Sequence, residues 1–205
     1  MLKRLVSVAL AAVLALGIFT AVLARPAQAV EIKQLHVSDK LVSLIKDMEG
    51  FDAIPYWDYG QWTVGFGSLC PEEHRARYTA EGIPPDEAHA LMIQQLEKFE
   101  ADVNLFMVRN QRQLNQHQFD ALVSFVYNVG SAVLYNKQSN VVKAVLNGAE
   151  GNEFMYAIGQ WCTAGGEFLL GLLRRRMSEA YMYLNGTYSE TLPGTFAYVM
   201  YDANG

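Results

Sequence analysis

Two carboxylates and a hydroxyl lie close together in the sequence. Eight residues separate Glu49 from Asp58, and four separate Asp58 from Thr63. Glycosidic bonds are cleaved by such a pair of carboxyls: one protonates the leaving oxygen, and the other stays ionised and activates water or stabilises the oxocarbenium-like transition state. A threonine hydroxyl beside them would orient the water. Glu49, Asp58 and Thr63 are therefore our candidate catalytic residues.

The stretch before Glu49 has the spacing of a helix that buries one face. Apolar residues recur at the i, i+3, i+4, i+7 positions: Leu41, Leu44, Ile45 and Met48. Glu49 then lies at the edge of the buried stripe, and Gly50 ends the helix. Burial disfavours the charged form of a carboxyl, which suits a general acid near neutral pH. We expect a partly buried proton donor here.

A β-hairpin is predicted to follow this helix. From Ile54 the residues are aromatic and β-branched around Gly60, which indicates two short strands and a tight turn. Asp58 lies beside the turn and should be more solvated than Glu49. We expect the two carboxyls to stand about 6.5 to 9.5 Å apart, the spacing of inverting enzymes, with Thr63 facing the same gap. If Asp58 is not the second carboxylate, Asp52 is the alternative.

These residues resemble the phage-type lysozymes of glycoside hydrolase family 24, whose motif is Glu, eight residues, Asp or Cys, five residues, Thr. The present chain has one residue fewer before Thr63 and carries Ser68 where the family usually has His. Two further blocks resemble the family, Gln113–Gly130 and Trp161–Ala180, so the resemblance spans about residues 38–184. It implies an α+β, mostly helical, lysozyme-like fold of two lobes, a small β-hairpin lobe and a larger helical lobe.

The resemblance also implies a muramidase that cleaves the β-1,4 bond between N-acetylmuramic acid and N-acetylglucosamine in peptidoglycan, with inversion. Four residues near the implied cleft are candidate substrate contacts, although helix capping is the commoner role for such residues: Tyr127, Asn128, Gln138 and Ser139. The alternative is a muramidase-like module that binds peptidoglycan or a partner protein without turnover. The shorter spacing before Thr63, Ser68 and the acidic composition favour that alternative.

Residues 1–29 are predicted to be a targeting segment. Lys3 and Arg4 precede an uncharged run of twenty residues, 5–24, and Ala27-Gln28-Ala29 fits a small-residue cleavage site. The run is also just long enough to span a bilayer, so two forms remain open: a cleaved signal peptide, or a signal-arrest-release segment that first tethers the enzyme to the inner membrane. Both predict export to the periplasm. We expect a catalytic domain at 30–185 and a C-terminal tail at 186–205.

Charge and cysteine content limit the other function classes. All 21 acidic residues follow residue 29, whereas three of the 16 basic ones precede it, so residues 30–205 carry a net charge near −8. Such a surface argues against nucleic acid as a partner. The four histidines share no ligand spacing, so we expect no metal site and no cofactor. Cys70 and Cys162 could form a disulfide in an exported protein, and we expect a monomer.

The rest of the chain is predicted to be mostly helical. Pro84-Pro85 and two acidic residues should open a long helix that ends near Phe106, after an irregular connection at 70–83. Asn115 and Gln118 form a capping-box pattern, and Ser139 should begin a short helix that closes at Asn147-Gly148. Trp161 is more typical of a core residue than of a sugar platform. Of the three consecutive arginines 174–176, at most two can reach the active-site side of a helix.

Overall fold

The computed structural model describes residues 31–58 and 60–190. The chain divides into two units, Met1–Val30 and Glu31–Gly205, and the described residues all belong to the second. The predicted targeting segment and residues 191–205 of the predicted tail therefore lie outside the described residues. Within the described ranges, no helix is both long and apolar enough to cross a membrane.

A three-stranded antiparallel sheet follows the first helix, as the hairpin prediction required. Its elements are α1 (Asp39–Glu49), β1 (Asp52–Asp58), β2 (Gln61–Gly65) and β3 (Ser68–Leu69). In the hairpin Tyr56 pairs with Thr63 and Asp58 pairs with Gln61. Because side chains alternate along a strand and paired residues share a face, Tyr56, Asp58 and Thr63 lie on one face of the sheet. Val64 lies on the other.

The connection after the sheet is helical, so our expectation of an irregular segment at 70–83 was wrong. Helix α2 (Glu72–Glu81) occupies most of it. Tyr78 is its only buried residue, so the helix has almost no apolar periodicity by which it could be recognised. The start signal was present, since Glu72 and Glu73 follow Pro71. With the sheet, α2 closes a small apolar cluster of Val64, Cys70, Tyr78, Ile83 and Ala88.

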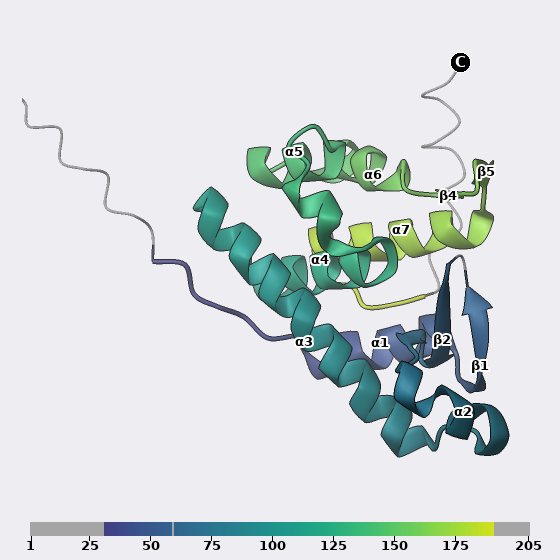
Figure 1. Cartoon of the computed structure of the whole chain (residues 1–205). Coiled ribbons are helices and arrows are strands. Elements are labelled where there is room, and N and C mark those ends of the chain that lie inside the picture. Colours follow the sequence, from purple (N-terminus) through teal and green to yellow (C-terminus); the bar gives the residue numbers. More distant parts are fainter. Residues whose placement is uncertain (1–30, 59, 191–205) are drawn as a thin grey trace, which may run out of the picture. The chain divides into compact units, whose positions relative to one another are not determined.

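Helix α3 (Pro85–Asn110) connects this sheet region to the remaining helices (Figure 1). It runs past the predicted end at Phe106 and stops where Gln111 adopts a left-handed conformation, with φ of 50°. The remaining elements are α4 (Gln116–Val129), the 3-10 helix η1 (Ser131–Tyr135), α5 (Asn140–Asn147), α6 (Gly151–Gly159), β4 (Thr163–Ala164), β5 (Glu167–Phe168) and α7 (Leu170–Asn185).

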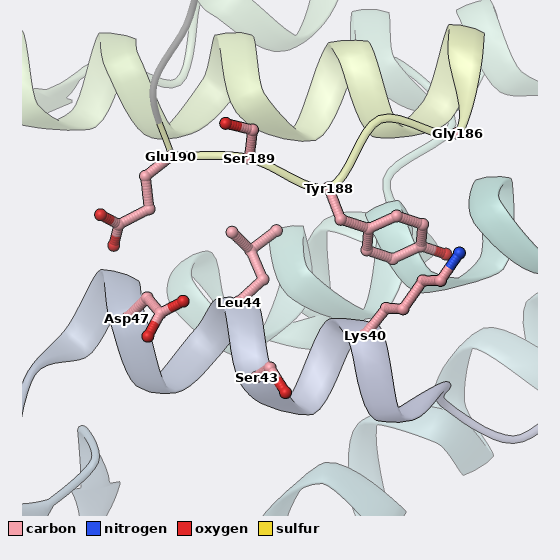
Figure 2. Close-up of a pocket in the computed structure, with 8 residues that line it drawn as sticks. All are labelled: Lys40, Ser43, Leu44, Asp47, Gly186, Tyr188, Ser189 and Glu190. Carbon is pink, nitrogen blue, oxygen red and sulfur yellow. The ribbon is translucent and has the colours of Figure 1, made fainter.

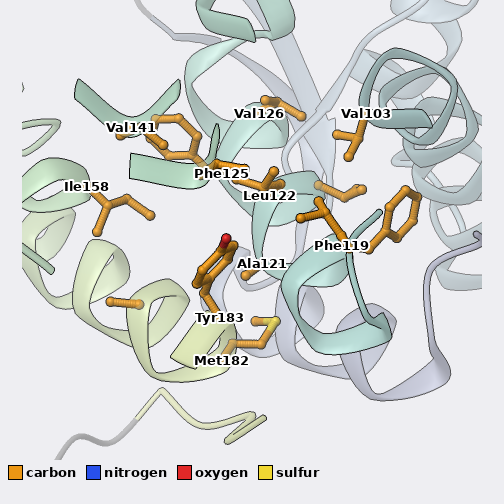
Figure 3. Packing of buried hydrophobic residues seen from close by; sticks show 14 of the residues in the cluster. Val103, Phe119, Ala121, Leu122, Phe125, Val126, Val141, Ile158, Met182 and Tyr183 are labelled. Atoms are coloured by element: carbon orange, nitrogen blue, oxygen red, sulfur yellow. The ribbon is translucent and has the colours of Figure 1, made fainter. Parts of the chain in front are cut away.

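The main core surrounds α4. Figure 3 shows Leu122 and Phe125 of this helix among residues of α3, α6 and α7. Phe154 and Tyr183 stack with ring centroids 3.8 Å apart. Trp161 packs edge-on against Phe125 at 5.6 Å, which confirms that it is a core residue. Burial of this apolar surface is the main force that fixes α7 against α4.

Predicted helix caps account for several helix ends. The side chain of Asn115 accepts from the Gln118 amide while the Gln118 side chain accepts from the Asn115 amide, so the capping box of α4 is confirmed. Ser139 occupies the N-cap position of α5, and Gly148 ends that helix with φ of 69°. These local signals could be read from the sequence because they depend on residues three or four positions apart.

The two ends of the described chain meet at Asp120, a fully buried residue of α4. The hydroxyl of Ser38, the N-cap residue of α1, donates to Asp120 Oδ2 at 2.6 Å, and the hydroxyl of Tyr188 donates to the same oxygen at 2.5 Å. Residues 186–190, expected to belong to the tail, thus pack across α1. Between α1 and this segment lies a pocket of about 610 Å³ (Figure 2), lined by Lys40, Ser43, Leu44, Asp47, Gly186, Tyr188, Ser189 and Glu190.

Candidate active site

Glu49 is the last residue of α1, and its side chain is 19% exposed. Ser38 caps the start of the helix, and Gly50 ends it with φ of 69°. The loop between β2 and β3 approaches the carboxyl closely: a Cβ at Gly67 would lie 2.6 Å from Glu49 Oε2. Glycine is therefore required at position 67, both for this approach and for its φ of 73°. The predicted partial burial of Glu49 is confirmed.

Arg175 of α7 holds the Glu49 carboxylate. Its Nη1 donates to Glu49 Oε1, and its side chain is only 9% exposed. Nε of the same guanidinium donates to Glu179 Oε1 at 3.2 Å. Burial tends to lower the pKa of Arg175, but Glu49 and Glu179 outweigh it, so the pKa lies above its usual value. Arg175 is thus a fixed positive charge that connects α1 to α7.

A buried network supports Arg175 from behind. Glu179, with no exposed surface, pairs with Arg176 at 2.8 Å between Oε2 and Nε, and accepts from the Ser124 hydroxyl at 3.0 Å. Nη2 of Arg176 donates to Asn128 Oδ1 at 2.9 Å. Burial lowers the pKa of Arg176, although the Glu179 charge opposes the shift. The network places two carboxylates and two guanidinium groups together, which compensates each buried charge.

The sheet presents the other two candidates. Asp58 is the last residue of β1, and Thr63 is 2% exposed in the middle of β2, on the same face. Among the described residues, Thr63 Oγ1 has no hydrogen-bond partner. A buried hydroxyl without a partner is uncommon and is available to a water molecule or ligand. The one-residue-shorter turn has therefore not moved Thr63 off the face that carries Asp58.

The Tyr56 hydroxyl interacts electrostatically with carboxylates of both α1 and the sheet. Burial and then the charges of Asp58, Asp52 and Glu49 raise the pKa of its phenol. The Tyr56 hydroxyl therefore interacts with the charges of both Glu49 from α1 and Asp58 from the sheet. Tyr56 itself, 38% exposed, was not among the predicted site residues.

Comparison with known proteins shows the family to which the chain belongs. The family model described as Phage lysozyme matches residues 46–179, which include Glu49, Asp58, Thr63 and Arg175. The chain belongs to the phage lysozyme family. The endolysin of Bacillus phage B103 is 30% identical over 161 residues, which cover 74% of this chain and 55% of the endolysin. The chain thus spans little more than half the length of that relative.

Two further family relatives are similar over most of their length. The SAR-endolysin of Haemophilus phage HP1 is 28% identical over 156 residues, which cover 72% of this chain and 80% of that protein. The solved structure of the endolysin from Escherichia coli O157:H7 phage FAHEc1 matches with a TM-score of 0.64 and 28% identity, covering 77% of this chain and 99% of that one. The phage lysozyme fold, α+β and mostly helical, is confirmed.

Of the four predicted substrate contacts, Tyr127 and Asn128 lie near the end of α4, whereas Gln138 and Ser139 lie just before α5. The Tyr127 hydroxyl donates to the Phe66 carbonyl at 2.8 Å, and its charge interaction with Glu49 places it beside the site. Burial raises the pKa of Tyr127 to about 12. Asn128 binds Arg176. Gln138 accepts from Lys143. Ser139 occupies the N-cap position of α5 without a side-chain cap bond, and its buried hydroxyl has no hydrogen-bond partner among the described residues.

The cysteine prediction was wrong. Cys70 and Cys162 are both buried and unpaired. Cys70 ends the sheet region and packs in the cluster with Val64 and Tyr78, whereas Cys162 lies between α6 and β4 on the helical side. A disulfide requires Cα atoms within about 7 Å, and Cys162 is not part of the apolar cluster that contains Cys70. In the described part of the chain, no three potential ligand side chains gather as a metal site would require.

The pocket in Figure 2 is separate from these residues. It lies on the face of α1 that contacts residues 186–190, and Glu49, Asp58 and Thr63 are not among its lining residues. Sequence reasoning missed Tyr56 and Glu179 and left open which arginine reaches Glu49. A signal existed for Glu179, which lies four residues from Arg175 and therefore shares its helix face.

Proposed function

We propose that the chain is a muramidase that hydrolyses the β-1,4 bond between N-acetylmuramic acid and N-acetylglucosamine in peptidoglycan. The observation that carries this proposal is the position of Glu49: a mostly buried carboxyl at a helix end, held by Arg175 and closely approached by the β2–β3 loop at Gly67. Family membership supports the same chemistry. Peptidoglycan is the proposed partner, and the protein acts as a monomer.

In the proposed mechanism, Glu49 in its protonated form donates its proton to the glycosidic oxygen as the bond to the anomeric carbon breaks. Asp58 stays ionised and either activates the attacking water or stabilises the oxocarbenium-like transition state. Thr63 Oγ1, which has no protein partner among the described residues, binds that water. Arg175 does not transfer a proton; it keeps the Glu49 carboxyl in one orientation.

The test is turnover of purified full-length protein on isolated peptidoglycan, followed by the release of reducing ends. We expect turnover by the wild type and none by Glu49→Gln. An inverting reaction would release the product first as the α anomer, which proton NMR of a short chitooligosaccharide or muropeptide digest can detect. A wild type that binds peptidoglycan and releases no reducing ends would favour the alternative of an inactive binding module.

We further propose that the protein is exported to the periplasm and held first at the inner membrane through residues 5–24. The twenty-residue uncharged run and its two basic residues support export. Similarity to a SAR-endolysin supports release without cleavage. Residues 5–24 lie outside the described ranges, so the support comes from sequence alone.

A further inference from the structure

Gly171 is a glycine that the fold does not need. It is the second residue of α7 and is exposed. Its φ lies outside the left-handed region in which glycine is favoured, and a Cβ built on it would meet no atom within 4 Å. Glycine weakens a helix relative to alanine because it loses more backbone freedom on folding. Neither backbone conformation nor packing within the protein therefore explains this residue.

The position of Gly171 on α7 suggests why a glycine occurs there. It precedes Arg175 by four residues, so both lie on the same face of α7. Side chains of a helix lean toward its N-terminus, which directs the Arg175 guanidinium over the turn that contains Gly171. Arg175 in turn binds Glu49. The missing side chain thus leaves open space one helix turn before Arg175, on the helix face from which Arg175 reaches the proposed proton donor.

The neighbours of Gly171 are also arranged for contact with a ligand. Phe168 of β5 is 57% exposed and Leu170 is 53% exposed, although both are apolar. Exposed apolar groups beside a bare stretch of backbone are typical of a surface that a partly apolar ligand covers. Sugar rings have apolar faces, and a glycan strand is flat enough to lie close to a helix turn that carries no side chain.

We propose that Gly171 is a specificity-determining position, at which the absent side chain lets the glycan strand lie against the first turn of α7 beside Glu49 and Arg175. This inference rests on the proposed function, since it takes the ligand to be a peptidoglycan strand. A side chain at position 171 would occupy the space of a sugar ring and push the strand away from the carboxyl.

The experiment measures binding separately from turnover. In full-length protein carrying Glu49→Gln, which holds the substrate without cleaving it, we would compare Gly171→Ala, Gly171→Leu and the parent by co-sedimentation with purified peptidoglycan. The matched control is Asn152→Leu, which places a leucine at the exposed second residue of α6, another helix without a side-chain cap. Thermal unfolding of each variant reports on the fold.

We expect Gly171→Leu to weaken binding about tenfold, the size of a moderate steric conflict in a packed contact, with Gly171→Ala in between. Asn152→Leu should bind like the parent, and neither Gly171 variant should unfold at a lower temperature. Equal binding by Gly171→Leu would overturn the inference, as would a loss that appears only with a lowered unfolding temperature. If the wild type cleaves no peptidoglycan, the proposed function fails, while the binding comparison still decides the role of Gly171.

Discussion

The Arg175 guanidinium binds the Glu49 carboxylate across 126 residues of chain. The last long helix therefore completes a site that the first helix begins. Because Glu179 and Arg176 hold Arg175 in turn, the orientation of the proposed acid depends on a buried network as well as on its own helix.

Replacing Glu49 by Gln should abolish lysis and leave the fold intact, since the amide fits the same space but donates no acidic proton. We expect a loss of at least about 10²- to 10⁴-fold, the usual contribution of a general acid. Reducing-end release gives the rate, and circular dichroism checks the fold. Wild-type rates in this variant would remove Glu49 from the mechanism.

Replacing Arg175 by Met should both slow turnover and destabilise the protein. Glu179, which is fully buried, would lose one of its two charged partners, and removing one partner of a buried ion pair typically costs about 3–5 kcal/mol. Urea unfolding measures the free energy of unfolding. The control is Arg174→Met, because Arg174 is the exposed neighbour on the same helix. Similar losses in both variants would contradict a specific role for Arg175.

Changes at Asp58 should separate its roles. We expect Asp58→Asn to be severely impaired, because an amide cannot activate water or stabilise positive charge as a carboxylate does. Asp58→Cys should retain activity, because the resembling family accepts Cys at this position. A fully active Asp58→Ala variant would transfer the role to Asp52, and the Asp52→Asn variant would then be the one to assay.

The raised pKa of Tyr127 predicts that the folded protein loses stability at alkaline pH. Its pKa is about 12 in the folded protein, against 10.0 for an unperturbed tyrosine, so folding favours the protonated phenol. The contribution is fully present below pH 10 and is lost as the pH rises through about 12. Tyr127→Phe should cost about 0.5–1.5 kcal/mol at neutral pH through the lost bond to the Phe66 carbonyl.

The measurement for Tyr127 is the free energy of unfolding as a function of pH, with tyrosinate absorbance followed in parallel. Tyr127→Phe should show a smaller alkaline decline than wild type. The decline should not vanish, since Tyr78 also has a pKa raised to about 12 by burial and by Glu87. An identical decline in wild type and variant would exclude Tyr127 as a contributor.

The fate of residues 1–29 can be decided by fractionation. If residues 5–24 form a release segment, the full-length protein should appear first in the membrane fraction and later in the soluble fraction at the same mass. N-terminal sequencing of the soluble form provides the check. A first residue of Val30 from the outset would instead establish cleavage of a signal peptide.

Sequence reasoning was most successful where the evidence was local. Apolar spacing predicted α1, alternation and Gly60 predicted the β1–β2 hairpin, and the Asn115–Gln118 pattern predicted the start of α4. Each depends on residues within one or two helix turns or one hairpin. Helix α2 was missed because it buries a single residue, Tyr78. It therefore lacks the apolar periodicity by which a helix is recognised in a sequence.

The contacts that assemble the site could not be predicted in the same way. Which of three consecutive arginines meets Glu49 depends on the rotation of α7 against α4, and that is fixed by core packing. Tyr56 interacts with the charges of Glu49 and Asp58 only because of the course that β1 takes in the folded protein. The missing disulfide has the same origin, because the separation of Cys70 from Cys162 is a property of the tertiary fold.

The meeting of Ser38 and Tyr188 at Asp120 has a consequence for the timing of activity during synthesis. Asp120, which binds the cap residue of the helix that carries Glu49, gains its bond from Tyr188 only when the chain has been made beyond residue 188. Translation at about 5–20 residues per second spends roughly 6–25 s between Glu49 and Arg175 alone. During that interval a nascent chain contains Glu49 without the groups that hold its carboxyl in place. A chain truncated before residue 175 would therefore contain the proposed proton donor but lack the guanidinium that orients it.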